Sequence, residues 1–494
     1  MSSFRIKAQN EFKKPGMKLQ ALGAGLLLLA GGCMVGPNYR QPDVPVPSAW
    51  KEAQGGGVDI RSAELTRWWT AFNDSLLNSL VERAVQSNLD LRLAEARIRE
   101  ARASRAVTAA GAWPTVDVSG SYAHIRNSEN ALPLPSQGGA PSPAVSGGDL
   151  EHHLFKTGFD ASWEIDLFGG VRRSVEGAEA NIDASVEDRR AALMTLLGDV
   201  AKNYIDLRSF QRRLTVARAN LKAQQETLDL TTVRFQVGLA SDLDVARAEA
   251  QVNTTAAQIP SLESFLKQAA HRLDVLLGSE PGALAEELST EAPIPVLPPE
   301  VLVGLPSELL RRRPDIRRAE RQLAAATAQI GAATADLFPK FSLTGSAGLQ
   351  SFSASDWFTS GSRFWSVGPT VRWPIFDAGR IRANIEVRNA QQEQALRQYE
   401  KAILTALEEV ENSLVNYAKE QARYRSLTGA VSANRRAVEM ANELYLSGLQ
   451  DFLNVLDAQR SLFTVENDLA QSEATMASNL VSLYKALGGG WETN

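Results

Sequence analysis

The chain has 494 residues, a formal net charge of −5 and one cysteine. This length allows more than one compact domain. The acidic balance argues against nucleic-acid binding, and one cysteine excludes both an intramolecular disulfide and a thiolate metal cage. None of the four histidines has a second histidine or a carboxylate at helical metal-site spacing, and His152 and His153 are merely adjacent at a strand start. We therefore expect no metal and no other cofactor.

The first 32 residues have the pattern of a signal peptide. Three lysines precede an apolar run over 19–30 that is too short to cross a bilayer as a helix. The run ends in LAGGC, and small residues before a cysteine are typical of a bacterial lipobox, although Ala30 stands where leucine is usual. We expect Cys33 to carry a diacylglycerol and an N-acyl chain such as palmitate, which would anchor the chain to a membrane. The alternative is a secretory signal with an incidental cysteine.

The remaining sequence contains one unit twice. Pro114 and Gly120 match Pro339 and Gly345 at one constant spacing, and later residues match at a second, shorter spacing. The spacing changes where the first copy carries a tract rich in Pro, Gly and Ser over 133–148, which is typical of a solvent loop. After the signal peptide, 1–32, we expect an extended segment over 33–64, a first repeat over 65–278, an extended proline-rich connector over 279–304, a second repeat over 305–488 and a tail over 489–494.

Each repeat contains two segments that alternate apolar and polar residues. They span 115–125, 155–166, 341–350 and 365–373, and the first is the weakest. About ten residues per strand, one apolar face and aromatic residues towards the ends are typical of transmembrane β-strands. A soluble sheet packed on helices is the alternative, because it also alternates. Four strands cannot close a barrel, and open sheet edges are not tolerated in lipid, so we expect an oligomer that shares its barrel.

Each repeat also predicts a very long helix followed by a returning helix. Residues 170–237 and 379–447 contain no proline, and their apolar residues step by four and three, which is coiled-coil spacing. Roughly 67 residues of helix would extend ~100 Å. Each helix ends at a glycine, Gly238 or Gly448, and returns over 242–277 or 451–487.

The strand and the long helix meet at a glycine in both repeats. DLFGGVR spans 166–172 and IFDAGRIR spans 375–382. We expect Gly169 and Gly379 to act as strand-to-helix hinges, because glycine turns without a Cβ clash. A basic stretch, RRRPD over 311–315, could form a binding patch. The simpler interpretation is a helix start, with Pro314 at the first position and Asp315 near the positive end of the helix dipole.

The pattern resembles the TolC superfamily, and most closely the NodT-type lipoprotein branch of outer membrane factors that serve RND efflux pumps. The matching stretches are VGPNY (35–39), WWTAFND (68–74), SWEIDLFGGVRR (162–173), LLRRRPDIRRAE (309–320), ATADLFPKFSLTG (333–345), WSVGPTVRWPIFDAGRIRA (365–383) and YKALGGGW (484–491). The resemblance implies an α+β membrane protein that forms a homotrimer. Its twelve-stranded outer-membrane β-barrel would continue into a twelve-helix periplasmic α-barrel.

The resemblance also implies function and partners. It predicts a lipid-anchored protein of the bacterial outer membrane that is not an enzyme and passively exports small toxic compounds, as in multidrug resistance. A periplasmic adaptor (membrane fusion) protein and an inner-membrane RND transporter would be its partners, besides outer-membrane lipids. Two alternatives are an exit duct for type I protein secretion and a non-channel coiled-coil scaffold lipoprotein.

Candidate gate residues come from the same resemblance and lie near the helix turns. Asp457 and Asp244 would each form a ring of three carboxylates in a trimer, and such rings favour cations. Tyr445 matches a tyrosine that helps to hold the closed tip. Two positions depart from the family pattern, since Asn454 replaces an acidic residue and Gln450 replaces an arginine. The simpler interpretation of both aspartates is a solvated charge near a helix N-terminus.

Overall fold

The computed structural model describes residues 34–52, 58–59, 65–126, 128, 151–295 and 301–491. The signal peptide, Cys33 and the loop tract over 133–148 lie outside these residues. The chain divides into two compact units, and each takes residues from both repeats. The sheet unit comprises Met1–Arg40, Arg102–Ala180 and Ala324–Gln394, and the helical unit comprises Gln41–Ala101, Asn181–Leu323 and Ala395–Asn494.

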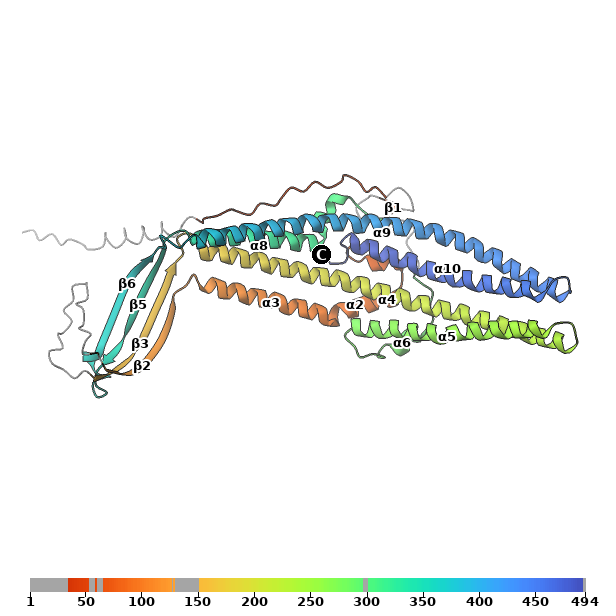
Figure 1. Ribbon diagram of the computed structural model, residues 1–494, viewed down its shortest axis with the longest axis horizontal. Coiled ribbons are helices and arrows are strands. Elements are labelled where there is room, and N and C mark those ends of the chain that lie inside the picture. The colour runs from red at the N-terminus through yellow and green to blue at the C-terminus, as the bar shows by residue number, and fades with distance from the viewer. Residues whose placement is uncertain are drawn as a thin grey trace, which may run out of the picture. The chain divides into compact units, whose positions relative to one another are not determined.

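Each principal helix of the first repeat has a counterpart of equal length in the second. The 22-residue pair is α3 (Leu89–Ala110) and α8 (Pro314–Ala335), the 67-residue pair is α4 (Gly170–Gln236) and α9 (Arg380–Leu446), and the 35-residue pair is α5 (Asp242–Leu276) and α10 (Phe452–Ala486). Figure 1 shows α5 returning along α4 and α10 along α9. At 1.5 Å per residue, α4 and α9 are each ~100 Å long. The predicted long helices and their returns are confirmed.

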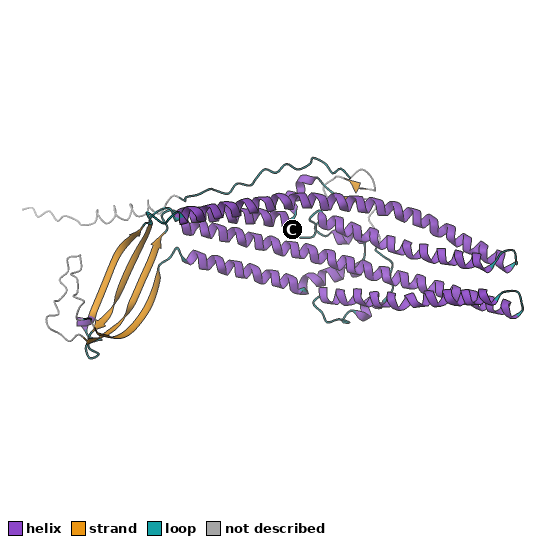
Figure 2. Ribbon diagram, in the orientation of Figure 1, coloured by secondary structure: helices purple, strands orange, loops and turns teal. Residues whose placement is uncertain are grey.

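The four predicted strands form one antiparallel sheet. They are β2 (Thr115–Arg126), β3 (Glu151–Ile165), β5 (Lys340–Ser351) and β6 (Arg363–Arg372), in the order β2-β3-β5-β6 (Figure 2). The short turn η3 (Ser360–Ser362) precedes β6. Among the described residues, β2 and β6 each pair with a single strand, so each leaves one open edge.

The register aligns apolar residues across the whole sheet. Val118 lies opposite Phe159, Phe159 opposite Ala347, and Ala347 opposite Trp365. Directly opposite residues in antiparallel strands share a face. Val118, Phe159 and Trp365 are each more than half exposed in the chain. The sheet therefore carries an apolar face that the described residues leave uncovered, as the alternation predicts.

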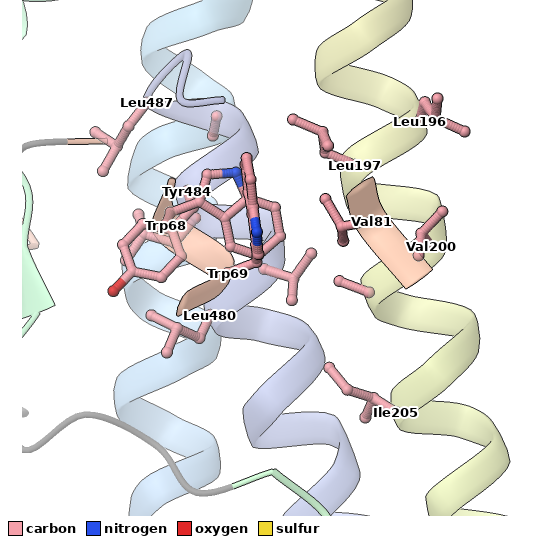
Figure 3. Close-up of a cluster of buried hydrophobic side chains, with 14 of the residues drawn as sticks. Trp68, Trp69, Val81, Leu196, Leu197, Val200, Ile205, Leu480, Tyr484 and Leu487 are labelled. Atoms are coloured by element: carbon pink, nitrogen blue, oxygen red, sulfur yellow. The ribbon is translucent and has the colours of Figure 1, made fainter. Parts of the chain in front are cut away.

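The largest core lies in the helical unit. Trp68, from the short helix η1 (Trp68–Phe72), stacks on Tyr484 of α10 with 5.5 Å between ring centroids, and Trp69 packs edge-on against Trp68. Figure 3 shows these rings beside Val81 of α2 (Ser75–Ser87) and Leu197 of α4. Truncation of a buried aromatic residue costs about 3–5 kcal/mol. The cluster connects η1, near the start of the helical unit, to the C-terminal part of α10.

The coiled-coil spacing of the first long helix corresponds to buried positions. In α4 the residues that follow this spacing are all buried, namely Val200, Tyr204, Leu207, Gln211 and Leu214. Among the described residues, none of the helices combines the length and apolarity needed to cross a bilayer.

The connector differs from the extended form that its prolines predict. It contains a single helical turn, α6 (Ala285–Ser289), where the sequence has no proline. The Asp274 carboxylate accepts hydrogen bonds from the backbone N–H groups of Gly282 (2.6 Å) and Leu284 (2.9 Å), which fixes the approach to α6. After this turn, β4 (Val301–Leu302) pairs in parallel with β1 (Val58–Asp59), and each strand has two residues.

The basic stretch at 311–315 is a helix start, as its simpler interpretation predicts. It follows η2 (Pro306–Glu308) and α7 (Leu309–Arg312), and Pro314 begins α8. The buried Arg313 side chain forms two hydrogen bonds to Asp315 (3.0 and 2.7 Å), donates to the Ala486 carbonyl (3.0 Å) and pairs with Glu409 (2.7 Å). Burial alone would raise the pKa of Asp315, but the hydrogen bonds and charge of Arg313 hold it below its usual value.

Candidate functional site

The helix turns carry the candidate gate residues, and both turns are built in the same way. Gly238 and Gly448 adopt φ of 76° and 73° after the long helices. In each turn the N–H of the residue after glycine donates back to a helix carbonyl, Leu239 to Arg234 (2.8 Å) and Leu449 to Leu444 (2.9 Å). This is the glycine-terminated Schellman pattern. Figure 2 shows the two short loops at which α4 meets α5 and α9 meets α10.

Asp244 lies in the first turn of α5 and caps that helix. The Ser241 Oγ accepts from the Asp244 N–H (3.2 Å), and the Asp244 Oδ2 accepts from the Ser241 N–H (3.1 Å) and the Ser241 hydroxyl (2.7 Å). This reciprocal capping box stabilises the start of a helix by satisfying two free N–H groups. The half-buried Asp244 carboxylate therefore has a structural task, and its part in a gate remains a prediction.

Asp457 lies on the second turn of α10 and is exposed. Asn454, one turn earlier on the same helix, is also exposed. Asp457 is thus accessible to solvent in the single chain, as a carboxylate that faces a pore must be. Its gating role is likewise still a prediction.

Tyr445 is buried among α9, α10 and the end of α4. Its ring packs against Phe452 at 5.5 Å between centroids, and the Arg234 guanidinium carbon lies 4.7 Å from the Tyr445 ring centroid. Arg234 also donates to the Leu446 carbonyl at 3.3 Å. The Tyr445 hydroxyl is buried and has no hydrogen-bond partner within the described parts of the chain.

The arginine beside Tyr445 was not found from the sequence. The resemblance leads us to expect an arginine at 450, where this chain has glutamine. The structure instead brings Arg234 from the other helix pair onto the ring, a cation–π arrangement. A basic residue in the last turn of α4 was the available signal, but it gave no indication of its partner.

The two glycines predicted as hinges share a backbone conformation that favours glycine. Gly169 and Gly379 adopt φ of 81° and 85°. A Cβ on Gly169 would lie 2.8 Å from the Cγ of Met34, whereas a Cβ on Gly379 would meet nothing within 4 Å. Both glycines thus adopt a left-handed conformation, and only Gly169 is also closely packed. Their role as hinges is still a prediction.

An aspartate caps the long helix at each joint. The Asp166 carboxylate accepts from the Arg172 N–H at 2.9 Å. The Asp377 carboxylate accepts from the N–H groups of Gly379 (3.0 Å) and Ile381 (2.9 Å). Both caps lie just before a 67-residue helix, so the strand ends where the helix dipole begins.

The segment directly after Cys33 is held against the first joint. The buried Arg173 side chain donates to the Val35 carbonyl (3.1 Å) and to the Asn38 side-chain oxygen (2.6 Å), and it pairs with Glu176 (2.7 Å). Gly36 packs so closely on Gly331 that an added Cβ would lie 2.4 Å from the Gly331 Cα. Cys33 itself lies outside the described residues, so its lipidation is still an expectation.

Neither a metal centre nor a catalytic group emerges around these positions. Where the structure describes the chain, it places no three His, Cys, Asp or Glu side chains so that they could hold a metal ion. The joints and the tips instead have structural features: helix caps, tight turns and a buried tyrosine.

Comparisons with known proteins identify what these features belong to. The pattern of the family described as "Outer membrane efflux protein" matches residues 80–279 and 305–489. The chain is 35% identical to nodulation protein T of Rhizobium leguminosarum bv. trifolii (94% of this chain, 96% of that protein). It is 34% identical to the solvent efflux pump outer membrane protein SrpC of Pseudomonas putida (97% and 100%). The solved outer-membrane channel OprN matches with a TM-score of 0.83 and 38% identity, covering 93% of this chain and 100% of that chain.

Proposed function

We propose that this chain, which belongs to the outer membrane efflux protein family, is the outer-membrane exit duct of a tripartite pump driven by an RND transporter. The family assignment itself establishes an outer-membrane efflux channel with a TolC-like fold, and not an enzyme. The observation that carries the finer proposal is the doubled unit of membrane-type strands joined through glycine to 67-residue helices. A helix of ~100 Å reaches far beyond the ~30 Å hydrocarbon core and suits a conduit across the periplasm.

The open sheet edges support a homotrimer. β2 and β6 each pair on one side only among the described residues, and unpaired edges are costly in lipid. Two chains would give eight strands, whose interior is just filled by side chains, whereas three chains give twelve and leave a lumen. Ile375 and Phe376, at the joint after β6, are 88% and 89% exposed. Such exposure of large apolar residues is typical of a surface that a partner covers.

The start of the mature chain supports lipid anchoring at the strand–helix joint. Met34 packs on Gly169, and Arg173 holds the backbone just beyond. Cys33 would therefore emerge where the membrane strand ends. Acyl chains at this joint would insert into the periplasmic leaflet of the outer membrane, and the helices would extend into the periplasm.

The helix tips support docking of a periplasmic adaptor protein. Val237, Leu239, Leu446 and Leu449 surround the two turns and are each more than half exposed. An apolar patch at the end of a polar helix pair is a site for a protein partner rather than for water. Asp244, Asp457 and Tyr445 lie on the helices next to these turns and would set the closed state of the pore.

Conductance and drug sensitivity test the proposal together. The purified protein is expected to run as a heat-modifiable oligomer and to give discrete single-channel currents in a planar bilayer. Deletion is expected to raise sensitivity to small toxicants once the matching pump is expressed, which agrees with the name of the solvent-efflux relative. Absence of both oligomer and current would indicate a scaffold. Normal tolerance across a broad panel, with loss of a secreted protein, would indicate type I secretion.

A further inference from the structure

Three of the four histidines lie at one end of the β2–β3 hairpin, away from the helices. Along one sheet face, successive cross-strand pairs are Tyr122–Phe155, His124–His153 and Arg126–Glu151. The apolar face thus ends in an aromatic pair, which is followed by an imidazole pair and then by an ion pair of 3.3 Å. Aromatic residues are typical of the membrane–water boundary. The two imidazoles therefore lie just outside that boundary, where water and ions reach them.

The two rings face each other through like nitrogens. The Nδ1 atoms of His124 and His153 lie 3.2 Å apart, and the ring planes are inclined by 42°. Two imidazole nitrogens that bind one tetrahedral Zn²⁺ at 2.0–2.1 Å are separated by about 3.3 Å. The observed distance between the two Nδ1 atoms therefore matches the distance needed to bind one Zn²⁺, without any change of the backbone.

A carboxylate orients the His124 ring for such a ligand, and a hydroxyl group lies beside the His153 ring. The Nε2 atom of His124 lies 3.7 Å from a carboxylate oxygen of Glu151, which favours a proton on Nε2 and leaves the Nδ1 lone pair towards His153. The Tyr122 hydroxyl oxygen lies 3.0 Å from the Nδ1 of His153. A hollow of about 540 Å³ opens beside them and is lined by Tyr122, His153, Phe155, Phe352, Ser353 and Ala354.

We propose that His124 and His153 form a two-histidine site for a borderline divalent cation such as Zn²⁺, Ni²⁺ or Cu²⁺. The cation joins β2 to β3 at the outer end of their hairpin, with water and Tyr122 in its remaining positions. Imidazole suits these cations, whereas Mg²⁺ and Ca²⁺ prefer oxygen ligands. Sequence spacing conceals the site, because the two histidines are distant in the chain and only the strand register brings them together. The site lies on the apolar face of the sheet, and the proposal does not depend on the proposed pump.

Calorimetric titration of the purified full-length protein, prepared without a histidine tag, tests this site with ZnCl₂. One Zn²⁺ per chain is expected. His124→Ala and His153→Ala should each weaken binding at least about tenfold, and Glu151→Gln by roughly tenfold through the orientation of His124. With Cu²⁺, electron paramagnetic resonance should report two nitrogen ligands. MgCl₂ should give no heat of binding.

Two matched variants serve as controls for the chain's other histidines. His152 projects from the opposite face of the same strand, and His271 lies exposed on α5. Removal of either should leave the Zn²⁺ affinity unchanged. The proposal is overturned if wild-type protein takes up no Zn²⁺, or if the double variant His124→Ala/His153→Ala binds it as tightly as wild type. In the first case the 3.2 Å contact is a simple hydrogen bond between imidazoles.

Discussion

Substitution of Gly379 tests whether the strand-to-helix joint depends on backbone conformation. Its φ of 85° lies in the left-handed region, and a Cβ there would meet nothing within 4 Å. Gly379→Ala should therefore cost only the conformational term, about 1–2 kcal/mol per chain. In a trimer the cost occurs three times, roughly 3–6 kcal/mol in all. Gly379→Val should cost more, because a β-branched residue fits this region least well.

Two other glycines separate conformation from packing. Gly169 has a similar φ, but its Cβ would also meet Met34 at 2.8 Å, so Gly169→Ala should be more harmful than Gly379→Ala. Gly429 lies inside α9 with open space around it. Gly429→Ala should therefore stabilise the protein by about 0.5–1 kcal/mol.

The assay is the yield of heat-modifiable oligomer from membranes, together with the unfolding temperature of the purified protein. The expected order of yield and stability is Gly429→Ala, wild type, Gly379→Ala and then Gly169→Ala. A normal yield and unchanged unfolding temperature for Gly379→Val would refute the reasoning and show that the joint tolerates other conformations.

Four further substitutions test the gate and the helix start. Asp457→Ala should raise the ion conductance of the purified oligomer, and unchanged currents would remove Asp457 from the gate. Tyr445→Phe should leave the thermal stability equal or higher, because the hydroxyl has no partner among the described residues. Arg234→Gln should lower the stability by about 0.5–2 kcal/mol, because the cation–π contact with Tyr445 is lost. Asp315→Asn should destabilise by about 1.5–3 kcal/mol at pH 7, because Arg313 loses one of its two carboxylate partners and keeps only Glu409. Since folding lowers the pKa of Asp315, this contribution is present above about pH 4 and is lost as the pH falls through the folded pKa, so denaturation curves of the two proteins should converge in acid.

The repeated architecture could be predicted because each part depends on local sequence. Absence of proline and heptad spacing determine α4 and α9, and period-two alternation determines the strands. A positive φ at Gly169 and Gly379 could be expected because few other residues adopt it, whereas their role as hinges stays a prediction. Even the equal lengths of the paired helices are implied by constant spacing between the two copies.

Contacts that depend on register between distant segments could not be predicted. Arg234 of α4 reaches Tyr445 of α9 only because the two helix hairpins pack in one particular register along their axes. His124 meets His153 only because the hairpin pairs in one of several possible registers across a long loop. The single turn of α6 arose where sequence composition suggested extended chain, because a buried Asp274 binds the backbone before it.

The most direct test of the shared conduit is the mass of the native protein extracted from the outer membrane in mild detergent. Native mass spectrometry should give a single assembly of three chains, since three copies are needed to pair every edge of β2 and β6 around a lumen. A stable monomer, or an assembly of two chains, would contradict the account.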